Sequence, residues 1–188
     1  QSADRIKVTL LEGWTVDQFA DELKDKLQID NFEFIRLSKD SDFIHSLNLD
    51  APSLEGFLSP DTYILLKTYT EEEIIEIMVN QFAHNRRKLL KEFKSVLPLN
   101  MREITTLASI IQGEAIHDDE MPIISSVYHN RLNNNMLLQA DPTIQYIIPG
   151  KPRRLYNKDL DVDSPYNTYK YKGLPPGPIN NPGLKALK

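Results

Sequence analysis

Glu114 has the spacing expected of a carboxyl that acts as a general acid. It lies three residues after Ile111 and seven after Leu107, in a segment over residues 101–116 whose apolar positions repeat at helical spacing. Glu114 therefore continues the buried stripe of a predicted helix. Partial burial and the negative end of the helix dipole both favour the protonated carboxyl, which predicts a raised pKa for Glu114. A carboxyl that stays neutral near neutral pH can protonate a leaving oxygen.

The same spacing also allows structural interpretations, which the pattern alone favours. The Glu114 carboxyl could edge the core with its head group in water, or it could pair with Arg131 on the next predicted helix. Gly113 beside it costs about 1 kcal/mol of helix stability relative to alanine. That glycine either lets a ligand approach the backbone or marks the end of the helix.

The composition argues against several other chemistries. The 188 residues include no cysteine, which removes disulfides, thiolate zinc sites and cysteine nucleophiles. His117, Asp118, Asp119 and His129 match no zinc spacing, so neither a metal nor a cofactor is predicted. A net charge of −5 argues against nucleic-acid binding. No run of 18 apolar residues occurs, so this sequence predicts no membrane span.

The composition of the chain changes along its length. Residues 141–188 hold eight Lys or Arg and four Asp or Glu, a net charge of +4, which leaves −9 for residues 1–140. Eight of the twelve prolines follow residue 140, and six of the eight tyrosines follow residue 125. Proline interrupts regular helix, so an acidic helical part precedes a basic, irregular one. An ordered, irregular surface of this kind is suited to hold a ligand.

The predicted fold class is α+β, a mostly helical core with short strands. Helical spacing and capping residues predict helices over residues 16–27, 31–37, 42–47, 70–97, 101–116 and 122–134. Strands are expected at 6–11, at 62–66 and within 138–175. A boundary near residue 50 is predicted to separate a small N-terminal part, 1–50, from a larger catalytic part, 51–188.

Six stretches stand in the order and with the gaps of one protein family. Two lie upstream, LLEG at 10–13 and LEGFLSPDTY at 54–63. The other four are LASIIQGE at 107–114, NRL at 130–132 with MLLQADPT at 136–143, SPYNTY at 164–169, and GLPPGPI at 173–179 with NPG at 181–183. Together they resemble the MltG, or YceG-like, family of endolytic murein transglycosylases over nearly the whole chain.

The resemblance implies a lytic cleavage of peptidoglycan. The β-1,4 bond between N-acetylmuramic acid and N-acetylglucosamine is cut inside nascent glycan strands, and a 1,6-anhydro end is left. No water is consumed, so one acid suffices: Glu114 would protonate the glycosidic oxygen and then, as carboxylate, accept the proton of the C6 hydroxyl. Two alternatives stay open. One is a hydrolase that uses Glu114 with Asp141 as two carboxyls about 5–9.5 Å apart, and the other is a peptidoglycan-binding module without catalysis.

The resemblance also implies a set of substrate-binding residues in the irregular part of the chain. They are Gln139, Asp141 and Thr143 from the 138–146 loop, and Tyr166, Asn167, Thr168 and Tyr169. Hydroxyl and amide groups suit sugar hydroxyls, and tyrosine rings suit the apolar faces of sugars. Structural interpretations stay open for three of them: Asp141 could cap a turn before Pro142, and Tyr166 and Tyr169 could pack a sheet.

One motif departs from the family pattern. The family run is close to Ser-Ile-Val-Glu-Lys-Glu-Thr, and here Gln112 replaces the first glutamate while Glu114 retains the second, which aligns with the acid. If the two were assigned the other way round, this chain would be an amide variant. The resemblance further implies a LysM-like character for residues 1–50 and cooperation with peptidoglycan synthases. It also implies a place at the outer face of the cytoplasmic membrane, anchored by a helix outside these residues.

Overall fold

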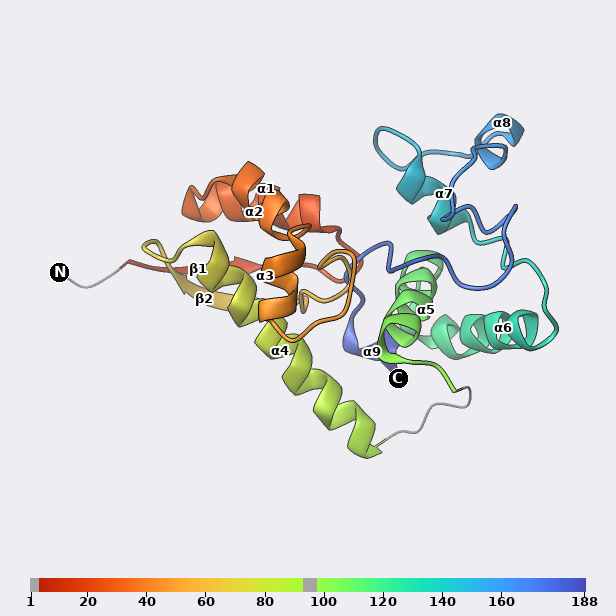
Figure 1. Ribbon diagram of the computed structural model, residues 1–188, viewed down its shortest axis with the longest axis horizontal. Coiled ribbons are helices and arrows are strands. Elements are labelled where there is room, and N and C mark those ends of the chain that lie inside the picture. Colours follow the sequence, from red (N-terminus) through yellow and green to blue (C-terminus); the bar gives the residue numbers. More distant parts are fainter. Residues whose placement is uncertain (1–3, 93–97) are drawn as a thin grey trace.

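The computed structural model describes residues 4–92 and 98–188, which form two lobes (Figure 1). The first lobe contains β1 (Arg5–Thr9), α1 (Val16–Leu27), α2 (Asn31–Leu37), α3 (Ser41–Ser46), β2 (Thr62–Leu66) and α4 (Glu71–Glu92). The second contains α5 (Met101–Glu114), a 3-10 turn (Asp118–Glu120), α6 (Met121–Asn133), α7 (Asp141–Ile147), α8 (Asn157–Leu160) and α9 (Leu184–Leu187). The α+β class is confirmed. The predicted end of the long helix, residues 93–97, lies outside the described residues.

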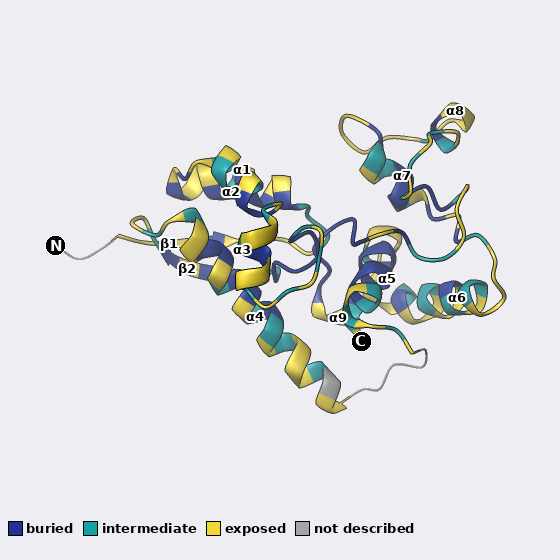
Figure 2. Ribbon diagram, in the orientation of Figure 1, coloured by how far each residue is buried: buried dark blue, intermediate teal, exposed yellow. Residues whose placement is uncertain are grey.

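The first lobe is built on one antiparallel strand pair. Strands β1 and β2 align Arg5 with Leu66 and Thr9 with Thr62, so alternate side chains such as Val8 and Leu65 point into the core. Helices α1 and α2 pack on each other, and α2 packs on α4. In Figure 2 the buried residues lie along the inner sides of these helices. The core of this lobe is therefore covered by helices that the spacing of their apolar residues predicts.

The two lobes have separate hydrophobic cores, and the first core extends beyond residue 50. Leu54, Leu58 and Tyr63 pack in the first core with residues as early as Val8. The second core begins in α5 and continues to α9. The described helices include none that is long and apolar enough to cross a membrane.

Helix α5 is the centre of the second lobe, where it contacts α6, α7 and α9. Asn100 and Glu103 form the capping box expected at its start: Asn100 Oδ1 accepts from Glu103 N at 3.0 Å, and Glu103 Oε2 accepts from Asn100 N at 2.8 Å. The strand expected within residues 138–175 is wrong. Those residues form α7 and α8 and irregular segments instead, because Pro142 at the first turn of α7 favours a helix start.

Asn181 ties the two lobes together from a fully buried position. Its Oδ1 accepts hydrogen bonds from Gly56 N at 2.9 Å and Leu58 N at 3.2 Å, and its Nδ2 donates to Trp14 O at 3.0 Å and to Glu55 Oε1 at 3.1 Å. Backbone bonds from Gly13 N to Asn181 O and from Asn181 N to Trp14 O complete the joint. The C-terminal segment thereby fixes the start of α1 beside the second lobe.

Glu55 makes the stability of this joint dependent on pH. Burial raises the pKa of Glu55 to about 8, while the hydrogen bond from Val16 N opposes that shift. An unfolded glutamate releases its proton near about pH 4.3, so between these values the folded state binds more protons than the unfolded state. The free energy of unfolding is therefore expected to fall as pH rises from about 5 to 8, by at most about 1.4 kcal/mol per pH unit from this group.

Denaturant unfolding of the wild type and of Glu55→Gln across this pH range measures the effect. The variant has no proton to lose at this position, so the difference between the two proteins isolates Glu55 from all other titrating groups. Parallel pH dependences for the two proteins would show that the folded-state pKa of Glu55 is not raised.

Candidate active site

Glu114 is the last residue of α5. The residue as a whole is exposed, while its carboxyl is partly withdrawn from water. The buried face of the helix runs from Thr105 to Ile111 and stops there, because the backbone turns to an extended conformation at Ala115. The predicted continuation of the helix to residue 116, and of the buried stripe to Glu114, is therefore wrong. The carboxyl lies at the helix end instead, on the wall of a cleft.

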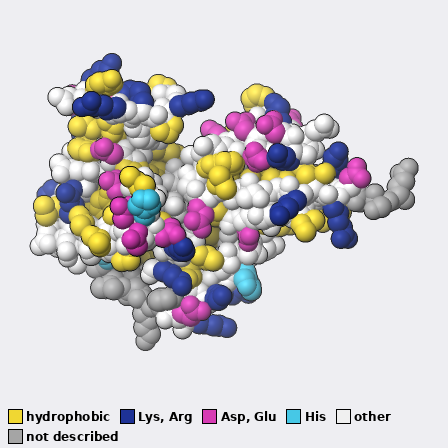
Figure 3. Space-filling model, turned by 180° about the vertical axis from the view of Figure 1, so that it is seen from behind, with side chains coloured by type: hydrophobic (Ala, Val, Ile, Leu, Met, Phe, Trp, Pro, Cys, Tyr) yellow, Lys and Arg dark blue, Asp and Glu magenta, His cyan; other side chains and the backbone are white. Residues whose placement is uncertain are grey.

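This cleft has a volume of about 450 Å³ and receives residues from both lobes. It is lined by Gly13, Thr15 and Gln18 from the first lobe and by Gly113, Glu114, Asp141, Pro142, Gln145, Tyr146, Pro152, Ile179 and Asn180 from the second. Seen from behind, the molecular surface is notched between the two lobes (Figure 3). The cleft thus places Glu114 and Asp141 opposite first-lobe residues that no local sequence pattern indicates.

The environment of Glu114 raises its pKa, as predicted. Removal from water is the largest cause, the negative charge of Asp141 is the second, and a hydrogen bond from the Tyr128 hydroxyl acts in the opposite direction. The cleft therefore favours the protonated acid, and Tyr128 offers a hydrogen bond to the carboxylate that forms once the proton has been given away.

Arg131 does not pair with Glu114. Its Nη1 donates to Leu138 O at 2.5 Å and lies 3.5 Å from Gln139 Oε1. Arg131 therefore holds the turn that leads from α6 to α7, and the alternative of a Glu114–Arg131 ion pair is wrong. Gln139 itself has a positive φ of 52°, and its side chain is exposed above that turn.

Asp141 is the first residue of α7 and accepts a hydrogen bond from the Tyr169 hydroxyl. The described contacts include no side-chain cap at this helix start, so the turn-capping interpretation of Asp141 is wrong. Tyr169 and Tyr166 are both half-buried, and no sheet lies in this lobe within the described residues. The Tyr166 ring packs instead against Tyr146, with 5.1 Å between the ring centroids.

Three of the predicted substrate-binding side chains are buried and face the protein. Thr143 and Thr168 hydroxyls lie 2.9 Å apart, and Thr168 Oγ1 also accepts from Ala140 N at 3.0 Å. Asn167 Nδ2 donates to Leu160 O and Val162 O. Direct substrate contact by Thr143, Asn167 and Thr168 stays a prediction. In this structure Thr143 and Thr168 hold the start of α7 against the 164–171 segment, and Asn167 ties that segment to residues 160–162.

Most residues that line the cleft were not predicted as site residues from the sequence, and Tyr146, Thr15 and Gln18 show why. Tyr146 could have been found, because a helix starting at Asp141 places residues 145 and 146 over its first turn. It was missed because a strand was expected in this region instead of a helix. Thr15 and Gln18 carry no such signal, since their place on this wall depends on the joint between the lobes.

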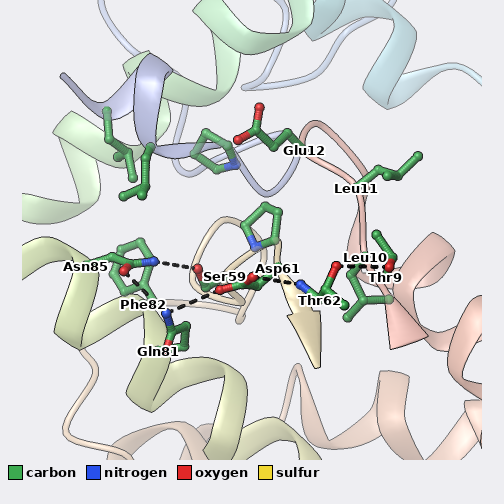
Figure 4. Close-up of a pocket in the computed structure, with 14 residues that line it drawn as sticks. Thr9, Leu10, Leu11, Glu12, Ser59, Asp61, Thr62, Gln81, Phe82 and Asn85 are labelled. Atoms are coloured by element: carbon green, nitrogen blue, oxygen red, sulfur yellow. Dashed lines mark hydrogen bonds between the residues drawn. The ribbon is translucent and has the colours of Figure 1, made fainter. Parts of the chain in front are cut away.

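A second pocket of about 450 Å³ lies on the seam formed by β2, α4 and α9 (Figure 4). Its polar side chains largely satisfy one another: Asn85 Nδ2 donates to Ser59 Oγ at 3.0 Å, and Gln81 Nε2 donates to Asp61 Oδ2 at 3.3 Å. None of the predicted site residues lines it. The cleft at Glu114 is therefore the candidate active site.

The match to a family model covers residues 1–188, and the model is described as the YceG-like family. The chain belongs to the YceG-like family. It is 34% identical to an endolytic murein transglycosylase of Bacillus subtilis (strain 168), over 96% of this chain and 54% of that protein. It is 31% identical to an endolytic murein transglycosylase of Streptococcus pneumoniae serotype 2 (strain D39), over 96% of this chain and 37% of that protein. The chain thus spans about half or less of the length of these relatives.

A solved structure shares the fold. The crystal structure of a yceG-like protein from Listeria monocytogenes superposes with a TM-score of 0.83 at 34% sequence identity. The match covers 96% of this chain and 64% of that one. The two-lobed arrangement is therefore that of a YceG-like protein.

Gln112, where this YceG-like chain departs from the expected motif, has a structural role. Its Oε1 accepts a hydrogen bond from Gly183 N at 3.0 Å, and Gln112 is not among the cleft residues. Gly113 lets α7 approach α5, because a Cβ at this position would lie 2.8 Å from Pro142 Cβ. Within this motif, Gln112 therefore packs against the C-terminal segment, whereas Gly113 and Glu114 line the cleft.

Two substitutions beside Glu114 are expected to move its pKa in opposite directions. Tyr128→Phe removes the hydrogen bond that favours the carboxylate, so the pKa of Glu114 rises further. Asp141→Asn removes a neighbouring negative charge, so the pKa falls. NMR titration of the Glu114 carboxyl measures both shifts without requiring a substrate.

Asp163→Asn is the matched control for this pair. Asp163 accepts from the Tyr171 hydroxyl much as Asp141 accepts from Tyr169, but it does not line the Glu114 cleft. The control should leave the Glu114 titration unchanged. Shifts of the same sign in Tyr128→Phe and Asp141→Asn would contradict the assigned causes.

Proposed function

We propose that this chain carries the catalytic part of an endolytic peptidoglycan lytic transglycosylase. The observation that carries the proposal is Glu114, a carboxyl with a raised pKa on the wall of a cleft between two lobes. The relatives named endolytic murein transglycosylases support the same reaction. The substrate is the MurNAc-β-1,4-GlcNAc bond of glycan strands.

The reaction needs one acid because its atoms balance without water. Glu114 donates its proton to the glycosidic oxygen as the bond from C1 of the muramyl sugar breaks. The C6 hydroxyl oxygen of the same sugar then bonds to C1, and its proton passes to the Glu114 carboxylate, which restores the acid. The Tyr128 hydroxyl stabilises that carboxylate between the two steps, and the negative charge of Asp141 favours the oxocarbenium-like sugar.

The exposed or half-buried side chains in and beside the cleft are proposed to bind the glycan. Asp141 and Tyr146 line the cleft with the acid. Tyr169 donates to Asp141, Tyr166 packs on Tyr146, and Gln139 lies just before α7. Tyrosine rings offer flat surfaces to the apolar faces of sugars. The LysM-like character of residues 1–50, cooperation with peptidoglycan synthases and anchoring at the outer face of the cytoplasmic membrane stay predictions.

A two-carboxylate hydrolase is the second candidate, because Asp141 lines the cleft close enough to raise the pKa of Glu114. Digestion of purified glycan strands in heavy-oxygen water separates the two reactions. The lyase gives 1,6-anhydro ends that are lighter by one water than reducing ends and carry no solvent oxygen. Labelled reducing ends would establish the hydrolase instead. Strands that bind and stay intact would identify a binding module.

A further inference from the structure

The wall of the cleft contributed by the first lobe takes no part in the proton transfers at Glu114. It consists of Gly13, Thr15 and Gln18, at the N-terminus of α1. The buried joint at Asn181 fixes this wall against the second lobe through Gly13 and Trp14. A ligand held between the two walls would therefore meet side chains that are already in place.

Gln18 is oriented by the capping box of α1. Its Oε1 accepts a hydrogen bond from Thr15 N at 2.9 Å and lies 3.4 Å from Thr15 Oγ1. The acceptor half of this side-chain amide is thereby occupied. The amide is planar, so the anchored oxygen also limits where the nitrogen can point. Gln18 is otherwise exposed in the cleft.

Among the three side-chain amides that line the cleft, Gln18 has the nitrogen that remains available. Gln145 Nε2 donates to Arg153 O, and Asn180 Nδ2 donates to Ser109 O at 2.8 Å. Within residues 4–92 and 98–188, Gln18 Nε2 makes no such bond. The cleft therefore offers a neutral N–H donor from the first lobe.

Asn180 offers the complementary group on the other wall. It is 5% exposed, and its Oδ1 has no hydrogen-bond partner among the described residues. A buried acceptor without a partner costs about 1–3 kcal/mol, which a donor on a ligand can recover. The cleft thus holds an unpartnered N–H donor on one wall and an unpartnered, buried acceptor on the other, and a secondary amide carries one group complementary to each.

We infer that Gln18 is a substrate-binding residue whose side-chain N–H donates to the carbonyl oxygen of a secondary amide on the glycan. The inference rests on the proposed function, since that function supplies the glycan. Such amides occur in the acetamido groups of the sugars and in the stem peptides. In either case the first lobe contributes to substrate affinity rather than only supporting the fold.

Gln18→Glu tests this with little disturbance of the helix. Glutamate also forms a capping box at this position, so the bond from Thr15 N is kept while the N–H donor is replaced by an oxygen. The dissociation constant for glycan strands, measured in a Glu114→Gln background that prevents turnover, is expected to rise about five- to tenfold. With Glu114 restored, KM should rise by a similar factor and kcat should change little.

Gln28→Glu is the matched control, because it makes the same charge change at an exposed site at the other end of α1. Three ligands locate the amide: strands with stem peptides, strands stripped of peptides, and stripped strands that are also de-N-acetylated. If Gln18→Glu loses affinity for stripped, acetylated strands, the amide belongs to the acetamido group. If it loses affinity only for peptide-bearing strands, the amide belongs to the stem peptide.

The inference is overturned if Gln18→Glu binds all three ligands as the parent does, or if Gln28→Glu loses as much affinity. It is also overturned if the loss persists in full with the stripped, de-N-acetylated strands. Absence of 1,6-anhydro ends from the wild type would instead overturn the proposed function, so the two failures are distinguishable.

Discussion

Glu114→Gln is expected to reduce the rate of glycan cleavage by about 10²–10⁴-fold, which is the range a general acid contributes. The amide keeps the size of the side chain and accepts a hydrogen bond from Tyr128, but it has no acidic proton for the glycosidic oxygen. Since Glu114 is exposed at the end of α5, the free energy of unfolding should change little. The rate is measured from the release of 1,6-anhydro ends by mass spectrometry.

Gln112→Glu is the control on the same helix. Its carboxylate can still accept the hydrogen bond from Gly183 N, so activity should be retained. The double variant, with Gln112→Glu and Glu114→Gln, should stay inactive because position 112 does not line the cleft. Cleavage by Glu114→Gln within tenfold of the wild type, or recovery in the double variant, would show that Glu114 is not the acid.

Asn181→Ala is expected to lower the free energy of unfolding by about 3 kcal/mol or more. The substitution leaves Gly56 N and Leu58 N without their acceptor and removes a donor from the buried Glu55 carboxyl. Each buried polar group that loses its partner costs about 1–3 kcal/mol, so several such losses exceed an ordinary point substitution. Denaturant unfolding followed by circular dichroism measures the change.

Asn134→Ala provides the comparison for this large effect. Asn134 is exposed, and its Nδ2 makes a single local bond to Asn130 O at 2.8 Å. Its removal should change the free energy of unfolding by no more than about 0.5 kcal/mol. If Asn181→Ala is as mild as Asn134→Ala, the two lobes do not depend on this joint.

The elements around the site were predictable where the signal is local. Apolar residues at helical spacing predicted α1 and α5 close to their observed bounds, and capping residues at Thr15 and Asn100 marked their starts. Pro122 at the first turn predicted α6. The region after residue 138 was harder. Its prolines excluded long helix but did not reveal the short helix α7, which Pro142 begins rather than ends.

Local spacing was enough to place Glu114 in the last turn of an amphipathic helix and to predict a raised pKa for it, and six motifs were enough to place the chain in one family. Which side chains share the cleft with Glu114 depends instead on tertiary contacts. Thr143 and Thr168 are buried, Arg131 holds a turn, and Gln18 comes from the other lobe. Periodicity and capping report on neighbours within a few residues, whereas the cleft depends on hydrogen bonds such as that from Gly56 N to Asn181, which join residues far apart in the sequence.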